Sequence, residues 1–201
     1  HPRRCARADG RSGTAIVPEC GTVLRMSQET PSWYVLTGGP CAGKTATIDE
    51  LAKRGYPVLA EPARLIIDEK LAAGHTIDEI VGDPDWLPSI VRRAHAQERE
   101  VSTGELFFFD RAAPDSLAYY KLAKRPVDDF FREAMNTIRY RKIFLLDLVD
   151  FKNDDGRPET PEQAMIIHGL IREAYVDQGY EIVEVPVMPV AERADFILAN
   201  L

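Results

Sequence analysis

The stretch YVLTGGPCAGKTA, residues 34–46, constrains the fold more than any other part of the chain. An apolar segment runs into glycines that form the pattern G-x-x-x-x-G-K-T, with Gly38, Gly43, Lys44 and Thr45 at the four fixed positions. In such a loop, backbone N–H groups curl around a phosphate and lead into the N-terminus of a helix. The lysine brings positive charge to the β- and γ-phosphates, and the threonine hydroxyl ligates Mg²⁺. The pattern therefore predicts a strand, a phosphate-binding loop (P-loop) and a helix that together hold a polyphosphate.

The whole loop is predicted to contact a nucleotide, with ATP as the expected ligand and GTP as a possibility. The predicted nucleotide-binding residues are Gly38, Gly39, Pro40, Cys41, Ala42, Gly43, Lys44, Thr45 and Ala46. Cys41 occupies a variable position of the pattern, and we interpret it as a small residue that fits the loop rather than as a redox centre. The chain has no N-K-x-D segment of the kind that reads guanine, which disfavours a GTPase of the Ras kind.

Composition narrows the class of protein further. A chain of 201 residues with 45% apolar and 28% charged residues is expected to form one soluble domain with a sizeable core. No apolar run approaches the ~18 residues of a membrane span. A net charge of −7 and a pI near 5.2 argue against nucleic acid as a partner. The odd number of cysteines favours a reducing cytoplasm over a disulfide or metal framework.

The first 25 residues differ from the rest of the sequence. They contain five arginines and two acidic residues, show no periodicity, and begin with His1 rather than with methionine. Met26 is a candidate for the true start. We interpret residues 1–25 as a disordered tail, or as one that is not native, with an organellar transit peptide as the alternative. Residues 26–201 are assigned to a single domain.

The remainder alternates between apolar strands and amphipathic helices. Strands are predicted at 33–37, 57–60, 105–110, 142–147 and 180–186. Helices are predicted at 45–55, 63–74, 89–104, 114–123, 127–139, from Thr160-Pro161 onward, and at 190–200. Strands separated by helices imply right-handed crossovers and a parallel sheet covered on both faces. The predicted fold class is therefore α/β, a three-layer P-loop NTPase fold.

In an open parallel sheet, ligands gather beyond the carboxyl ends of the strands. The charged residues predicted at this rim are Glu61, Arg64, Asp110, Arg111, Asp115, Asp147, Lys152, Asp154, Asp155 and Arg157. Arg139 and Arg141 precede the fourth strand, so we place them at the opposite edge with a structural role.

Two residues at the end of the third strand are candidate catalytic groups. Asp110 stands where P-loop proteins keep a carboxylate linked to the metal, so it is predicted to act with Thr45 on Mg²⁺. The alternative is a solvated aspartate at a strand end. Arg111 could clamp the transferring phosphoryl group, and its alternative is a surface ion pair with Asp115.

Glu61 is the candidate general base. It follows the second strand, with Pro62 fixing the turn, and faces phosphates that would repel a carboxylate unless an acceptor hydroxyl needed one. The alternatives are a helix N-cap or a partner for Arg64. Glu61, Arg64 and Asp115 are predicted to contact the substrate. The loop FKNDDGRPET is a candidate lid that closes Arg157 over the phosphates, or else a plain surface loop.

A pocket for the phosphoryl acceptor needs walls beside the P-loop, and one part of the sequence is a candidate for them. The helix 89–104 and the segment around Trp86 are predicted to form them, and Gln97 or Arg93 could read a polar ring. We favour the alternative that this charged helix face is simply solvated. The isolated histidines, which include His168, are interpreted as surface or packing residues.

Several motifs together resemble the small AAA-type P-loop ATPase/kinase family that includes the nicotinamide riboside kinase domain. They are TGGPCAGKT, RGYPVLAEPAR, FFFDRAAPDSLAYY, IFLLD, DDGR and GYEIVEVPVMPVAERADFIL. The resemblance implies a sheet of five parallel strands like that of nucleoside and nucleotide kinases. Deoxynucleoside kinases have a similar Glu-Pro at Glu61, where the glutamate acts as base, and thymidylate kinases have a similar D-R at Asp110-Arg111. Ala112 departs from the Ser, Tyr or Phe common there, and nicotinamide riboside kinases lack the arginine.

Three functions remain open from the sequence. The favoured one is a kinase that transfers the γ-phosphoryl group of Mg·ATP to a hydroxyl or phosphate of a small nucleoside-like metabolite. The second is a nucleotide-binding regulatory switch or slow NTPase. A motor-type ATPase is least favoured, because FFFDR lacks the acidic residue that usually follows the Walker aspartate.

Overall fold

The structure is a computed structural model that describes residues 30–137, 139–149 and 160–201. The predicted tail and the predicted lid, including Arg157, Lys152, Asp154 and Asp155, lie outside the described residues. Five strands form one parallel sheet in the order β2-β3-β1-β4-β5. They are β1 (Trp33–Thr37), β2 (Val58–Leu59), β3 (Phe107–Asp110), β4 (Lys142–Leu146) and β5 (Ile182–Val185). The predicted five-stranded parallel sheet is confirmed.

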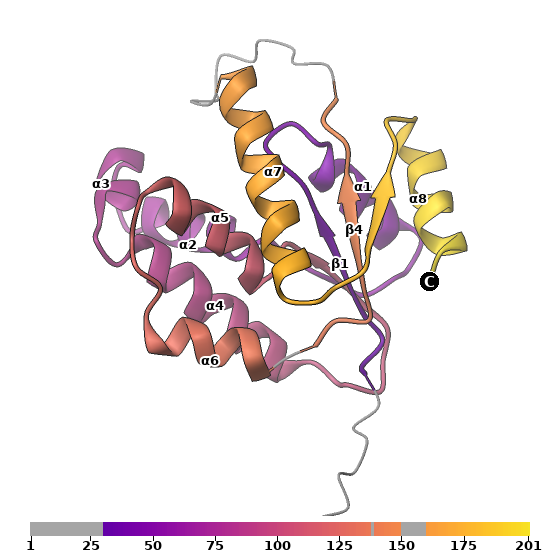
Figure 1. Cartoon of the computed structure of the whole chain (residues 1–201), viewed down its shortest axis with the longest axis horizontal. Helices are drawn as coiled ribbons and strands as arrows, with labels where there is room; N and C mark the ends of the chain where they lie inside the picture. Colours follow the sequence, from indigo (N-terminus) through magenta and orange to yellow (C-terminus); the bar gives the residue numbers. More distant parts are fainter. Residues whose placement is uncertain (1–29, 138, 150–159) are drawn as a thin grey trace, which may run out of the picture.

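Helices cover both faces of this sheet (Figure 1). Those described are α1 (Lys44–Lys53), α2 (Pro62–Ala72), α3 (Ile77–Gly82), α4 (Trp86–Glu100), α5 (Ala113–Leu122), α6 (Asp129–Thr137), α7 (Pro161–Asp177) and α8 (Val190–Ala199). Alternate residues of β1 separate two cores: Leu36 packs with residues of α1 and α8, whereas Val35 packs with residues of α5 and α7. Because side chains alternate along a strand, the two cores lie on opposite faces. This is the predicted three-layer architecture.

Local signals explain where several elements begin. Thr160 caps α7 by accepting a hydrogen bond from the Gln163 N–H, and Pro161 occupies the first turn, as predicted. The helix predicted at 89–104 instead spans Trp86–Glu100, so Trp86 begins it. Helix α3 is not among the predicted helices, although its N-cap Thr76 and Glu79 form a capping box.

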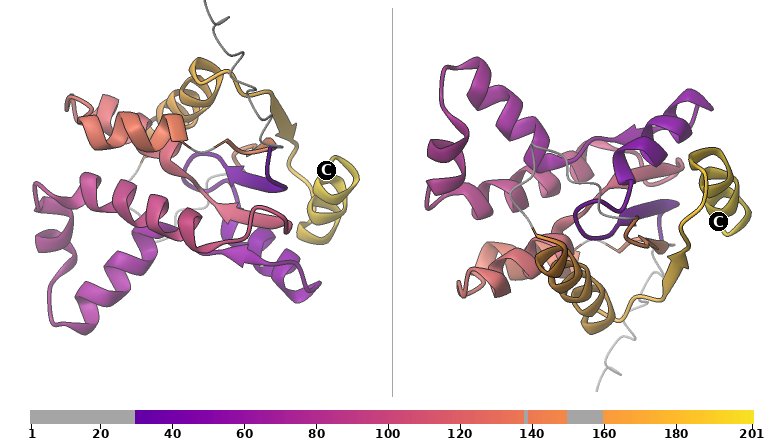
Figure 2. Two further views of the ribbon diagram at one scale, coloured as in Figure 1. Left: turned by 90° about the horizontal axis from the view of Figure 1, so that it is seen from below. Right: turned by 90° about the horizontal axis from the view of Figure 1, so that it is seen from above.

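A group of helices extends beyond the sheet. Figure 2 shows the purple and magenta segments of α2, α3 and α4 projecting to one side. A third core joins α4 of this projection to α5 and α6, with Val91, Tyr120 and Phe131 among its buried residues. This projection supplies the walls of the cavity described below.

Candidate active site

The P-loop connects β1 to α1 and depends on two glycines with left-handed backbone. Gly38 has φ of 140°, and a Cβ there would lie 2.6 Å from the Leu146 carbonyl oxygen. Gly43 has φ of 72°, and a Cβ there would lie 2.6 Å from a guanidinium nitrogen of Arg193. A larger residue would be strained at both positions, and at Gly38 its Cβ would also clash with backbone. The fixed glycines of the sequence pattern are therefore required by the backbone conformation of the loop.

Lys44 closes the loop on itself. Its Nζ donates hydrogen bonds to the carbonyl oxygens of Gly38 (2.9 Å) and Gly39 (2.8 Å). Burial lowers the pKa of Lys44 to about 7, and the positive charge of Arg111 lowers it further. A bound phosphate would reverse this effect because it brings negative charge to the ammonium group. Lys44 is thus positioned for an anionic ligand that the loop can hold.

Asp110 ends β3, where its backbone pairs with Leu36 of β1 beside the P-loop. The side chain is buried, and its Oδ1 has no hydrogen-bond partner among the described residues. Burial raises the pKa of Asp110 to about 6, with the nearby Glu61 adding to the shift. Thr45 lies exposed in the first turn of α1. The alternative of a solvated strand-end aspartate is wrong, because the carboxyl group is buried.

Arg111 has a left-handed backbone, with φ of 67°. Its Nε lies 2.9 Å from Glu61 Oε1, and its other end donates to Asp115 Oδ1 at 3.3 Å. Burial opposes its charge, but Tyr119 and the two carboxylates outweigh that effect and hold its pKa above the ordinary value. The predicted pair with Asp115 exists, although it is buried rather than on the surface. A non-glycine residue in this conformation is uncommon and occurs at functional sites.

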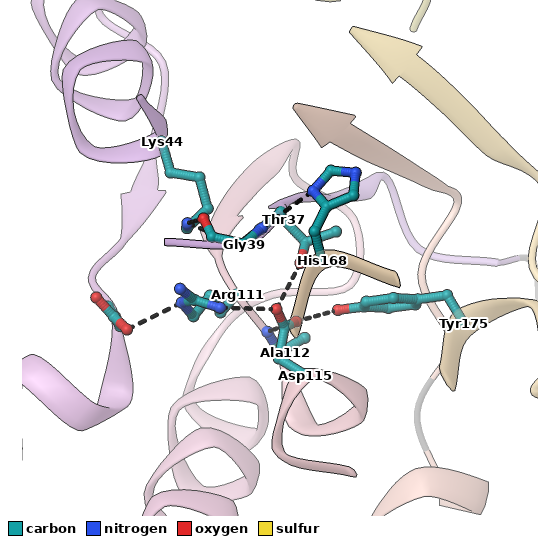
Figure 3. Close-up of polar contacts among 10 residues, drawn as sticks. Thr37, Gly39, Lys44, Arg111, Ala112, Asp115, His168 and Tyr175 are labelled. Atoms are coloured by element: carbon teal, nitrogen blue, oxygen red, sulfur yellow. Dashed lines mark hydrogen bonds and ion pairs between the residues drawn. The ribbon is translucent and has the colours of Figure 1, made fainter. Parts of the chain in front are cut away.

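Asp115 is the centre of a buried hydrogen-bond network (Figure 3). Its Oδ1 accepts from the Thr37 hydroxyl at 2.5 Å as well as from Arg111. Its Oδ2 accepts from the Tyr175 hydroxyl at 2.5 Å and from the Ala112 N–H at 3.1 Å. Both oxygens are therefore engaged within the protein. This geometry favours a positioning role for Asp115 over the predicted contact with substrate.

Glu61 lies between the phosphate loop and the helical projection. It is the N-cap residue of α2, but its side chain makes no capping hydrogen bond. It pairs with Arg111 rather than with Arg64, which is exposed and does not line the cavity. Glu61 therefore occupies the N-cap position of one alternative without capping the helix through its side chain, and the alternative of a partner for Arg64 is wrong. The pair stays 30% exposed on the Glu61 side.

A cavity of about 540 Å³ opens beside this pair. Glu61, Arg111 and Asp115 line it together with residues of α2, α3, α4, α5 and α7. The predicted helix 89–104 contributes Ile90 and Ala94, and the segment around Trp86 contributes Trp86 and Leu87. A candidate pocket for a second substrate thus adjoins the P-loop.

Other residues considered in the sequence lie away from this cavity. Arg93 makes a two-pronged ion pair with Glu69, and the Gln97 amide donates to the Ala60 carbonyl at 3.2 Å. Arg139 lies over the Tyr180 ring, and Arg141 donates to the Thr30 carbonyl. The two arginines are at the amino edge of the sheet, as predicted.

Four residues of the site were not found from the sequence. Thr37 and Tyr175 hold Asp115, as described above. His168 Nδ1 accepts from the Gly39 N–H at 3.2 Å, and burial lowers its pKa. Arg193 donates to the Ala42 carbonyl at 2.9 Å from beneath the loop. These contacts come from helix packing, which leaves no local motif.

Neither a membrane-spanning helix nor a preformed metal cluster is found in the part of the chain that the structure describes. No helix there is long and apolar enough to cross a membrane. No group of three or more His, Cys, Asp or Glu residues there is arranged to hold a metal ion.

Comparison with solved structures finds similar folds, including those of two kinases. The NadR protein in complex with NR aligns with a TM-score of 0.63 and 19% identity, over 84% of this chain and 50% of that one. The chain therefore spans about half the length of NadR. Deoxyadenosine kinase from M. mycoides aligns with a TM-score of 0.58 and 14% identity, over 84% and 97% of the two chains. Shikimate kinase from Acinetobacter baumannii, in complex with shikimate, gives 0.51 and 17%, over 86% and 93%.

Sequence comparison is more specific about the family. Comparison with proteins of curated function finds no match. A family model described as "AAA domain" matches residues 33–193, which is most of the chain. The protein therefore belongs to this AAA domain family and has the three-layer fold of P-loop nucleoside and nucleotide kinases.

Proposed function

We propose that the protein is a small-molecule kinase that transfers the γ-phosphoryl group of Mg·ATP to a hydroxyl or phosphate of a nucleoside-like metabolite. The observation that carries this proposal is the Glu61–Arg111 pair, which stands where the P-loop meets the cavity. A kinase needs a carboxylate and a guanidinium at that boundary, between its two substrates. NadR, deoxyadenosine kinase and shikimate kinase support the proposal through their similar folds.

Two residues suit the Mg²⁺ that would accompany the nucleotide. The buried Asp110 Oδ1 has no hydrogen-bond partner among the described residues, and the Thr45 hydroxyl lies at the start of α1. Carboxylate and hydroxyl oxygens are ligands that Mg²⁺ accepts alongside phosphate oxygens and water. When bound, the metal would neutralise charge on the β- and γ-phosphates.

The chain's own groups account for the remaining requirements. Lys44 exchanges its two carbonyl partners for phosphate oxygens, and Arg111 faces the transferring group. The acceptor oxygen forms a bond to the γ-phosphorus as the bond to the bridging oxygen breaks, and ADP leaves with that electron pair. The proton of an acceptor hydroxyl moves to the Glu61 carboxylate. A phosphate acceptor would need no such transfer.

Glu61→Gln tests this assignment because it keeps the size of the side chain and removes the basic oxygen. Acceptor-dependent ADP release should fall by about 10²–10⁴, with Mg·ATP affinity nearly unchanged. Glu69→Gln is the matched control, because Glu69 is on the same helix, is also paired with an arginine, and does not line the cavity. It should keep parental turnover. Weakened nucleotide binding with normal turnover in Glu61→Gln would contradict the role of base.

A nucleotide-binding switch or slow NTPase is the second candidate. The observation that favours it is the ion pair between Glu61 and Arg111, because a switch, unlike a kinase, needs no free base. The two candidates differ in turnover. A kinase consumes ATP rapidly only when an acceptor is present, whereas a switch binds nucleotide tightly and turns over slowly whatever is added. A screen of nucleosides, nucleotides and related metabolites for stimulated ADP release separates them.

A further inference from the structure

The cavity beside the P-loop is strongly divided in polarity. Its charged residues, Glu61, Arg111 and Asp115, are close enough to Lys44 of the P-loop to interact with it electrostatically. Twelve of its eighteen lining residues are apolar, and they include Ile67, Trp86 and Ile90. Ligand sites commonly combine an apolar wall with a few convergent polar groups that fix orientation. The reacting group of an acceptor therefore belongs at the charged end and its body against the apolar wall.

The charge of the cavity disfavours an anionic acceptor. Arg111 is the one cation among the described residues that line it, and two carboxylates already hold that cation. The described lining therefore carries one more negative than positive charge. A phosphate or carboxylate on the acceptor body would meet no free cationic partner among the described lining residues, and desolvating an unpaired charge is costly.

The two polar residues of α4 that could read a heterocyclic ring make contacts within the protein instead. Arg93 is bound to Glu69, and Gln97 donates to the Ala60 carbonyl. Gln163 does line the cavity, but its Oε1 accepts from the Thr160 N–H. If a ring rich in hydrogen-bonding groups bound against the apolar wall, the polar groups of the ring would lack hydrogen-bond partners there.

The outer part of the cavity exposes apolar side chains to solvent. Ile77 and Val81 of α3 and Leu122 of α5 line it, yet remain 47%, 51% and 49% exposed. Covering such surface contributes about 25 cal/mol per Å². An apolar ligand body would gain this contribution, whereas a strongly hydrated one would lose its own hydration.

We propose that the acceptor is an alcohol with an apolar body that carries neither phosphate nor carboxylate, placed with its hydroxyl at Glu61 and its body against α2, α3 and α4. This inference rests on the proposed kinase function and narrows it from "hydroxyl or phosphate" to hydroxyl. It also narrows the body of the acceptor from nucleoside-like to predominantly apolar.

Binding of a matched pair of probes tests the class of ligand. Calorimetry with the full chain and Mg·AMP-PNP compares 2-naphthylmethanol with 2-naphthylmethyl phosphate, and adenosine with AMP. The naphthyl alcohol should bind at least about tenfold more tightly than its phosphate ester, because only the ester brings an unpaired charge. It should also bind more tightly than adenosine. Tighter binding of AMP or of the naphthyl ester would overturn the inference.

A pair of variants on α2 locates the bound alcohol. Ile67 lines the cavity, whereas Leu71, one turn later, is 42% exposed and does not. Ile67→Asn should weaken binding of 2-naphthylmethanol about tenfold or more, and Leu71→Asn should leave it unchanged. Equal effects of the two substitutions would show that the alcohol binds outside this cavity and would overturn the inference.

ADP release with the same probes separates this inference from the function on which it rests. Stimulation by the alcohol supports both. Stimulation by AMP or the naphthyl ester alone would keep the kinase and overturn the acceptor class. Tight binding of the alcohol without stimulated release by any probe, in a chain that still binds ATP, would instead overturn the kinase and leave the apolar ligand class standing.

Discussion

Asp115 offers a sharp test of how the site is held together. Its two oxygens accept four hydrogen bonds, from Thr37, Tyr175, Ala112 and Arg111, and its side chain is 4% exposed. Asp115→Asn preserves shape but turns one of the two oxygens into an NH₂ group, which cannot accept. Whichever oxygen is replaced, two of the four donors lose their acceptor.

The cost follows from the charge and burial of these bonds. A hydrogen bond to a charged group contributes about 1.5–3 kcal/mol. The loss of two such bonds should therefore lower the free energy of unfolding by about 3–6 kcal/mol, a large part of the 5–15 kcal/mol typical of a domain. Tyr175→Phe removes only one bond and should cost about 1–3 kcal/mol.

Equilibrium unfolding in urea measures the effect as a lower midpoint at unchanged slope. Asp177→Asn is the control, because Asp177 is 63% exposed and only 3.8 Å from its partner Lys121. It should change stability by less than about 1 kcal/mol. An Asp115→Asn protein as stable as the parent would refute the reasoning, and would restore the prediction that Asp115 is available to substrate.

Two further predictions concern buried titratable groups. Lys44→Ala should lower turnover by about 10²–10³. The pKa of Lys44 is about 7 without ligand, and the charge of a bound phosphate should raise it. Binding of Mg·ATP at about pH 8 should therefore be accompanied by uptake of a proton by Lys44. Calorimetry in two buffers of different ionisation enthalpy detects the uptake, which Lys44→Ala should abolish. Burial raises the pKa of Glu98, which accepts a hydrogen bond from Tyr140, to about 7 from 4.5. Between pH 4.5 and about 7, Glu98 is therefore protonated in the folded chain and ionised in the unfolded chain. The stability that Glu98 contributes is fully present below pH 4.5 and is lost as the pH rises through about 7. Glu98→Gln should make the unfolding free energy fall less between pH 5 and 8, and an unchanged slope would contradict this.

The sheet could be predicted because its signals are local. Apolar segments such as 142–147 are long enough to be strands and are separated by helices, so the parallel order follows. The P-loop is equally local, since Gly38 and Gly43 meet their constraints within a few residues. The capping box of Thr76 and Glu79 is also a local signal. The helix α3 that follows it is not predicted, because it is short and mostly exposed and so shows little apolar periodicity.

The inner organisation of the site could not be predicted in the same way. Tyr175 is sixty positions from Asp115, and His168 is 129 positions from Gly39. Tyr175 meets Asp115 because α7 packs against α5. His168 meets Gly39 because α7 also packs close to the P-loop, where a Cβ on Gly39 would lie 2.8 Å from the Ala164 carbonyl oxygen. A tyrosine or histidine on a helix gives no sign of such a partner, because most of them serve packing. The sequence predicted the rim residues and offered the pair of Arg111 with Asp115, but it did not predict the pair of Arg111 with Glu61.

The two ion pairs of Arg111 differ in a way that bears on catalysis. The pair with Asp115 is buried, so breaking it would leave a desolvated charge at a cost of several kcal/mol. The pair with Glu61 is more exposed, 30% on the carboxylate side against 4% for Asp115, so separating it leaves less desolvated charge. Glu61 can therefore exchange Arg111 for an acceptor hydroxyl at a lower cost than Asp115 could, while Asp115 keeps the guanidinium in place. Glu61 is paired with Arg111 in this structure, and it would become available as a base once an acceptor enters the cavity.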